Sequence, residues 1–232
     1  MNFKVKTWTI GAVVAELPEA SEIFDAYGID FCCGGNRLLA DVIAVQGIDG
    51  QALYEKLNEA QQRRSQAYKG MGTRFTEMEA TVLSTYIEDT HHVYLRTALP
   101  QLADLLYTVL RAHGKNHREL YDVYRVFGQL KGDLEQHLLK EESLLFPAFA
   151  EEEYHTQEIG ELSQEIITEH EAAGDLLAEL RKLTGDYLLP EDACTTFHRA
   201  YEMLKELESD LHQHIHLENN ILLRSYDKRA TA

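Results

Sequence analysis

Apolar side chains recur every three to four residues along most of the chain beyond residue 75, a period that predicts amphipathic helices. Bends are expected near Pro100 and Pro147, because proline removes a backbone hydrogen bond inside a helix. The connections between the helices are short, which is typical of antiparallel neighbours in an up-down bundle. The pattern therefore predicts an all-α fold built on an antiparallel four-helix bundle. The expected helices span residues 76–110, 117–151, 156–184 and 191–226.

The N-terminal stretch has a different pattern, in which glycines separate short apolar runs and are expected to end short helices. We expect a small helical domain over residues 1–68, a glycine-containing linker over residues 69–75, and the bundle over residues 76–232. Between the first short runs lies DFCCGG, which is too rich in glycine for a helix and predicts a turn. This turn presents two adjacent thiols, Cys32 and Cys33.

Two segments of the predicted bundle resemble each other closely. LEQHLLKEESLL contains His137 and Glu141, and LHQHIHLENNIL contains His214 and Glu218 at the same spacing. Residues four apart on a helix project from one face, so each segment directs an imidazole and a carboxylate toward one point. The repeat predicts two ligand pairs for one shared metal site.

Each of these segments follows another histidine at nearly the same distance along the chain, His92 in the first case and His170 in the second. The local frames Thr-His-His and Thr-Glu-His agree, and this agreement selects His92 over its neighbour His91 as the ligand. Three further residues are expected to hydrogen-bond ligands from outside the site, because ligating imidazoles need partners for their second nitrogen. These residues are His91, Asp133 and Glu169.

Four imidazoles and two carboxylates without a thiolate suit iron, manganese or zinc better than copper(I) or an iron-sulfur cluster. Glu141 and Glu218 are placed to bridge two metal ions, which leaves open positions for an oxo bridge, water or a small molecule. Which histidines share an ion is a hypothesis at this point. The hypothesis pairs His92 with His137 and His170 with His214.

A single histidine on a helix is more often an ordinary surface or core residue than a ligand, and only the repeated spacing argues for a site. Side chains two positions apart on a helix differ in direction by about 200°. His212 and His216, each two residues from His214, are therefore expected to face away from the site. Cys194 is expected to be a small buried residue. The remaining histidines are expected to be solvated: His113, His117, His155 and His198.

Composition narrows the classes of partner. The formal net charge of -17 repels nucleic acid and anionic lipid surfaces, so neither is expected as a partner. No stretch approaches the roughly 18 to 20 apolar residues that span a bilayer, and no secretory signal is recognised, so a cytoplasmic location is expected. Three cysteines cannot form a disulfide framework, and in a reducing compartment they stay thiols.

Together these motifs resemble the repair of iron centres family. DFCCGG is similar to the small cysteine-bearing domain of that family, and the two His-x-x-x-Glu segments are similar to its hemerythrin-like bundle. The resemblance covers nearly the whole chain. It implies iron as the metal, in a carboxylate-bridged pair expected to be oxo-bridged when oxidised, and it implies a role in restoring iron-sulfur clusters after nitrosative or oxidative stress.

The expected activity follows from this resemblance. The irons are expected to be donated to damaged iron-sulfur proteins or to process nitric oxide, and Cys32 and Cys33 are expected to contribute as thiols, although two incidental thiols in a turn are an equal alternative. The alternative functions are a nitric oxide reductase and a dioxygen carrier or sensor of the hemerythrin type. The sequence leaves open whether the protein is an enzyme, and it is compatible with a homodimer.

Overall fold

A computed structural model describes residues 7–67, 75–150 and 156–224 of the 232-residue chain. These residues are helical apart from their connections, and the only β pairing among them is an isolated bridge between Thr9 and Leu38. The predicted all-α class is confirmed. None of the described helices combines the length and the apolar character needed to cross a bilayer.

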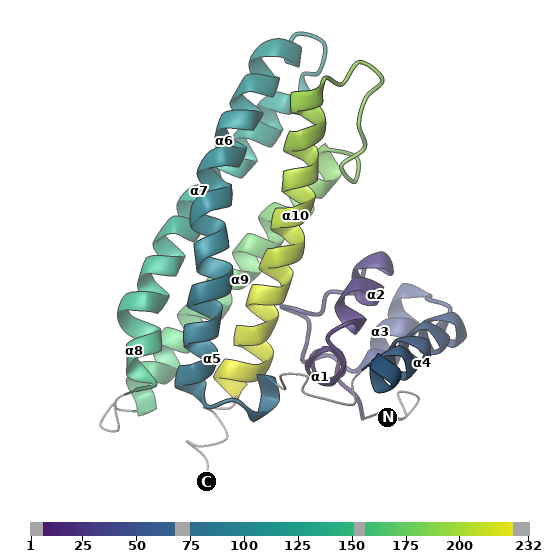
Figure 1. The fold of residues 1–232 in the computed structure, drawn as a ribbon, viewed down its shortest axis with the longest axis vertical. Coiled ribbons are helices and arrows are strands. Elements are labelled where there is room, and N and C mark those ends of the chain that lie inside the picture. Colours follow the sequence, from purple (N-terminus) through teal and green to yellow (C-terminus); the bar gives the residue numbers. More distant parts are fainter. Residues whose placement is uncertain (1–6, 68–74, 151–155, 225–232) are drawn as a thin grey trace. The chain divides into compact units, whose positions relative to one another are not determined.

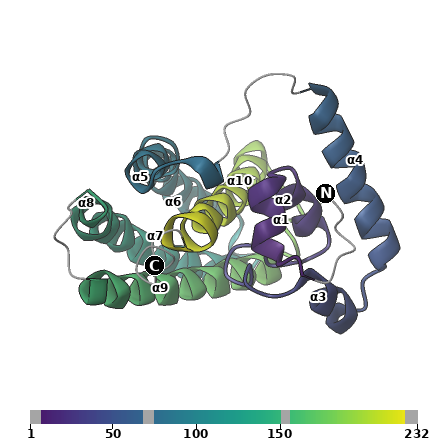
Figure 2. The same ribbon diagram turned by 90° about the horizontal axis from the view of Figure 1, so that it is seen from below.

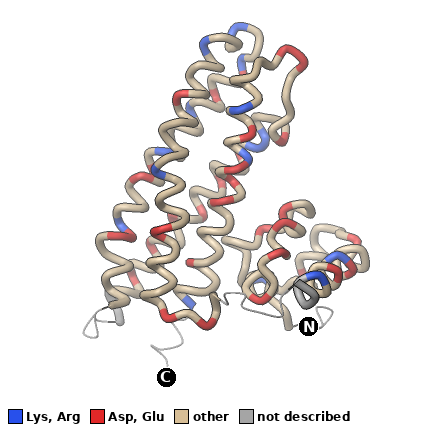
Figure 3. The backbone as a smooth tube through the Cα atoms, viewed as in Figure 1, with Lys and Arg blue, Asp and Glu red and all other residues tan. Residues whose placement is uncertain are grey.

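Backbone contacts divide the chain into two units, residues 1–83 together with 212–232, and residues 84–211. The predicted linker lies almost entirely outside the described residues, so the predicted domain bounds stay a prediction. Charged side chains are spread over the helices of each unit, with Asp and Glu in the majority (Figure 3).

The first unit contains short helices around a small apolar core. Thr9 begins the first helix by accepting a hydrogen bond from the backbone N–H of Ala12, and Gly47 ends the third in the left-handed conformation that glycine adopts readily. Large buried side chains such as Phe24 and Leu57 fill the centre of this core. The helices of the N-terminal part are α1 (Ile10–Glu16), α2 (Ala20–Ala26), α3 (Leu39–Gln46), α4 (Gly50–Ala67), the 3-10 turn η1 (Phe75–Glu77) and α5 (Ala80–Ile87).

The second unit contains most of the bundle, and the end of its last helix belongs to the first unit. Figures 1 and 2 show α6, α7, α9 and α10 side by side, with successive helices running in opposite directions. One continuous apolar core joins all four, since it includes Leu99, Leu130, Leu177 and Leu204. The antiparallel four-helix bundle is therefore confirmed. Its helices are α6 (Val93–His113), α7 (Glu119–Lys140), α8 (Phe146–Ala148), α9 (Thr156–Leu183) and α10 (Thr195–Leu217).

Three π-helical turns interrupt the long helices, and the sequence pattern did not predict them. They are η2 (Glu88–His92), η3 (Glu141–Leu145) and η4 (Glu218–Leu222). The expected helix over residues 76–110 is thus divided into α5, η2 and α6, and α6 continues through Pro100. A π turn inserts one extra residue into the helical repeat and is frequent at functional sites.

Candidate metal centre

The six residues predicted as ligands come from four helical segments of the bundle. His92 ends η2, His137 lies in the last turn of α7 and Glu141 begins η3. His170 lies within α9, whereas α10 carries His214 and continues without a break into η4, which begins at Glu218. All six are buried, and both glutamates have no exposed surface. Buried carboxylates require a charged partner or a metal ion, so this concentration of polar groups is itself a sign of a site.

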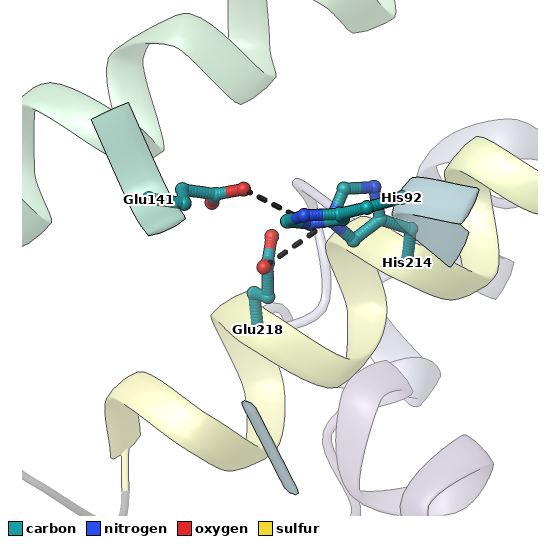
Figure 4. Close-up of side chains that lie close together, drawn as sticks. All are labelled: His92, Glu141, His214 and Glu218. Carbon is teal, nitrogen blue, oxygen red and sulfur yellow. Dashed lines mark ion pairs between the residues drawn. The ribbon is translucent and has the colours of Figure 1, made fainter. Parts of the chain in front are cut away.

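The structure brings the six residues together as two overlapping groups, each of which could hold a metal ion. In each group the four candidate ligand atoms lie within 4.8 Å of one another. Figure 4 shows the first group, in which both carboxylates point toward the imidazoles of His92 and His214. Glu141 and Glu218 belong to both groups, whereas each histidine belongs to one. The second group is completed by His137 and His170.

The structure groups the histidines differently from the expected pairing. His92 shares a group with His214, and His137 shares the other with His170, whose Nε2 atom lies 3.1 Å from Nε2 of His137. The pairing inferred from sequence joined histidines of the same helical hairpin. Which side chains meet depends instead on which helices are neighbours at the level of the site, and the spacing along the chain does not contain this information.

The separations between candidate ligand atoms suit a transition metal. Nε2 of His137 lies 3.2 Å from the Glu141 carboxylate, and Nε2 of His92 lies 3.4 Å from it. His214 and Glu218 are 3.2 Å apart. Two atoms that bind one ion at about 2.1 Å, at angles between a right angle and tetrahedral, lie about 3.0–3.4 Å from each other. Nitrogen and oxygen donors in this number fit iron, manganese or zinc.

Carboxylates behind two of the imidazoles fix their orientation. Nδ1 of His137 lies 2.8 Å from Glu169, and Nδ1 of His92 lies 2.7 Å from Glu142. Each of these acids also pairs with a cation, Lys140 beside Glu169 and Arg96 beside Glu142. The hydrogen bonds from His137 and Lys140 lower the pKa of Glu169 to about 2. Both imidazoles therefore direct Nε2 toward the buried carboxylates.

The three residues expected to support the ligands have different surroundings. Glu169 contacts His137 as described, whereas His91 contacts Asp210 at 2.9 Å. Asp133 is exposed, and no described hydrogen bond joins it to a ligand histidine. Glu142 was missed, because the equivalent position in the repeat is Asn219 and the repeated spacing therefore does not mark it.

The histidines beside His214 contact the DFCCGG turn, which belongs to the same unit. His212 and His216 both lie edge-on to the ring of Phe31, at centroid distances of 5.7 and 5.9 Å. Nδ2 of Asn220 donates hydrogen bonds to the backbone carbonyls of Phe31 and Cys32, at 3.2 and 3.0 Å. The face of the C-terminal helix that does not carry the candidate ligands thus packs on the turn.

Within the turn, the Asp30 carboxylate organises the two thiols. It accepts hydrogen bonds from the backbone N–H groups of Cys32, Cys33 and Gly34, and from the Cys32 thiol at 3.2 Å. The two sulfur atoms are 3.6 Å apart. A hydrogen bond with Cys33, together with burial, raises the pKa of the Cys32 thiol. Cys32 is thus a buried neutral thiol, and Cys33 is the more accessible sulfur.

Two expectations about other residues need correction. Cys194 is exposed rather than buried, because it lies in the connection before α10. His113 and His117 are half-buried and partnered rather than simply solvated. His198 is exposed, as expected, and His155 lies outside the described residues.

The sequence matches two known domains and is similar to known proteins over most of its length. Residues 6–61 match a domain of unknown function (DUF542), and residues 83–226 match the hemerythrin HHE cation binding domain. An iron-sulfur cluster repair protein ScdA of Staphylococcus haemolyticus is 29% identical over 222 residues, which is 94% of this chain and 96% of the relative. An iron-sulfur cluster repair protein YtfE of Yersinia pseudotuberculosis is 31% identical, over 92% of this chain and 94% of the relative.

Proposed function

This chain belongs to the family of iron-sulfur cluster repair proteins that carry a hemerythrin HHE cation binding domain, and we propose that it repairs iron-sulfur clusters damaged by nitrosative or oxidative stress. In this proposal the protein holds two iron ions, oxo-bridged when oxidised, and either donates iron to the damaged protein or processes nitric oxide. The names of the relatives support the repair role, and the buried His and Glu groups support the iron site.

The sharing of Glu141 and Glu218 between the two groups is the observation that carries the two-iron proposal. Two histidines and the two shared glutamates would hold each ion. This number of protein ligands would leave positions for a small ligand. Iron, when bound, supplies the redox chemistry and the coordination positions for nitric oxide or dioxygen.

Neighbouring residues of the chain orient the candidate ligands. Glu142 and Glu169 accept hydrogen bonds from the Nδ1–H groups of His92 and His137, so the lone pair of each Nε2 is available to a metal. The full burial of Glu141 and Glu218 keeps water from competing for the carboxylates. This arrangement supports firm binding of iron by ligands that leave some of its coordination positions open. Such a site suits reaction or release of iron better than inert storage.

Cys32 and Cys33 are part of the proposal as thiols that receive iron or reduce its acceptor. The accessible Cys33 sulfur beside a buried Cys32 thiol supports a role in which Cys33 makes the first contact. The matched test is the Cys32→Ser/Cys33→Ser double variant. It is expected to keep its iron and its visible spectrum while losing repair activity. Normal repair by this variant would remove the thiols from the proposal.

The repair assay uses an iron-sulfur enzyme whose cluster has been damaged anaerobically with nitric oxide. Adding the iron-loaded chain is expected to restore the enzyme's activity, whereas the His137→Ala variant, loaded under the same conditions, restores little. Ferrous iron in equal amount with a competing chelator is the control for free metal. Restoration by this control as fast as by the protein would contradict repair by donation.

Reactions of the reduced protein with nitric oxide and with dioxygen distinguish iron donation from the two alternative activities. Nitrous oxide formed over many turnovers by the reduced protein would establish a nitric oxide reductase, whereas a single stoichiometric reaction favours the donor. A dioxygen adduct that forms and reverses without oxidation of the irons would instead establish a carrier or sensor of the hemerythrin type.

A further inference from the structure

A second cluster of metal-binding side chains lies at the other end of the bundle. It contains His113, the last residue of α6, and His117 in the turn before α7, together with Asp192 from the connection before α10. Figure 1 shows these connections at the same end of the bundle. Helices rise about 1.5 Å per residue, so the length of α6 separates this cluster from His92 by about 30 Å.

The geometry of the cluster is that of a metal site. The ligand atoms of His113, His117 and Asp192 lie within 4.8 Å of one another, and Nε2 of His117 is 2.8 Å from the Asp192 carboxylate. Two imidazoles and one carboxylate from two separate connections therefore converge on one point.

The surrounding structure holds the two imidazoles in place. The backbone N–H of His117 donates to the carbonyl of His113 at 2.9 Å, which extends the helical turn and keeps both side chains on one side. The buried ring of Phe197 lies against both, with centroid distances of 5.2 Å to His113 and 5.9 Å to His117. Neither ring is free to turn into solvent without losing this contact.

A second carboxylate lies behind His117. Its Nδ1 atom is 3.2 Å from Glu119, on the opposite side of the ring from Asp192. A metal ion bound to Nε2 leaves the N–H on Nδ1, which then donates to Glu119. Metal-ligating histidines almost always make such a contact, and the same arrangement occurs at His92 and His137 in the first site.

We propose that His113, His117 and Asp192 form a zinc site that joins the α6–α7 and α9–α10 connections. Zinc binds imidazole and carboxylate ligands in tetrahedral sites, and three protein ligands with a water molecule in the fourth position are one of its usual sets. Two imidazoles beside a single carboxylate also suit zinc better than calcium or magnesium, which take mainly oxygen ligands. The site lies at the surface, since the Asp192 side chain is 53% exposed, so zinc enters it directly from solvent.

Metal content of the full iron-loaded chain tests this proposal. The protein is incubated with Zn²⁺ under a non-thiol reductant, passed over a desalting column with a weak chelator, and measured for iron and zinc in the same sample. One zinc per chain is expected in addition to the iron. His117→Ala and Asp192→Asn are expected to weaken zinc binding by at least about 100-fold, and Glu119→Gln by about 10-fold.

Two matched controls locate the zinc. His198→Ala changes an exposed histidine of α10 that is close in sequence to Asp192, and Cys32→Ser/Cys33→Ser removes the two thiols of the DFCCGG turn, so both variants are expected to retain the zinc.

The proposal is overturned if the wild-type chain retains no zinc while its iron is intact, because His117 and Asp192 then form only an ion pair. It is equally overturned if Asp192→Asn and His117→Ala retain zinc as well as the wild type. The iron content of the same samples reports separately on the first site, so failure at one site is distinguishable from failure at the other.

Discussion

His137 and Glu169 lie on facing helices, α7 and α9, with Nδ1 of the imidazole 2.8 Å from the carboxylate. Glu169 in turn pairs with Lys140, one turn beyond His137. The contact fixes the ring of a candidate iron ligand from behind, and it links the two helices that carry the histidines of the second group. Its removal tests whether the outer carboxylates matter for metal binding.

Glu169→Gln is expected to weaken iron retention by about 10- to 100-fold, because a neutral amide holds the Nδ1 proton less strongly. The measurement is the rate at which a strong chelator removes iron from the loaded protein. Glu165→Gln is the matched control, since Glu165 also contacts Lys140 but is not hydrogen-bonded to His137. Equal rates of iron release for the two variants would show that the hydrogen bond between His137 and Glu169 does not affect iron retention.

Substitution of the shared carboxylates is expected to affect both irons. Glu218→Ala should remove both, because Glu218 belongs to both groups, whereas His92→Ala should leave the iron held by His137 and His170. Iron per chain and the visible absorption of the oxidised protein are the readouts. His212→Ala is the control on the opposite face of the same helix. Similar iron loss in all three variants would show that the face assignment is mistaken.

Gly35 contacts Asn220 so closely that a side chain does not fit. A Cβ atom at Gly35 would lie 2.2 Å from Oδ1 of Asn220, so Gly35→Ala is expected to destabilise this unit by roughly 1–3 kcal/mol. Trp8, the single tryptophan, lies in this unit, so its fluorescence follows the unfolding in urea.

Two variants check the cause of this effect. Gly128 in α7 has no atom near the position of a Cβ, so Gly128→Ala is expected to be neutral or to stabilise by up to about 1 kcal/mol. Asn220→Ala in the Gly35→Ala background makes room for the methyl group, and the two losses are expected to be less than additive. Full additivity would mean that the clash is not the cause.

The two adjacent thiols are expected to differ in reactivity. At pH 8, iodoacetamide should modify Cys33 well before Cys32, because the raised pKa of Cys32 leaves very little thiolate and its side chain is only 5% exposed. The rates are read by mass spectrometry after short exposures. In urea the difference should disappear. Equal rates in the folded protein would contradict the buried neutral thiol.

The sequence by itself determined the features that depend on local spacing. Residues i and i+4 share a helix face whatever the rest of the fold does, so the pairs His137–Glu141 and His214–Glu218 and the bundle itself were predictable from periodicity. The matched frames likewise led to His92 and His170, and the structure brings all six residues into the two groups.

Only the tertiary structure decided which of these side chains meet. The grouping of His92 with His214, the support of His92 by Glu142, and the convergence of His117 with Asp192 each join residues from helices or connections far apart in the sequence. Such contacts follow from which helices pack as neighbours and from the π turns that rotate the side chains after them. Both depend on close packing of the whole bundle, which a periodic pattern does not encode.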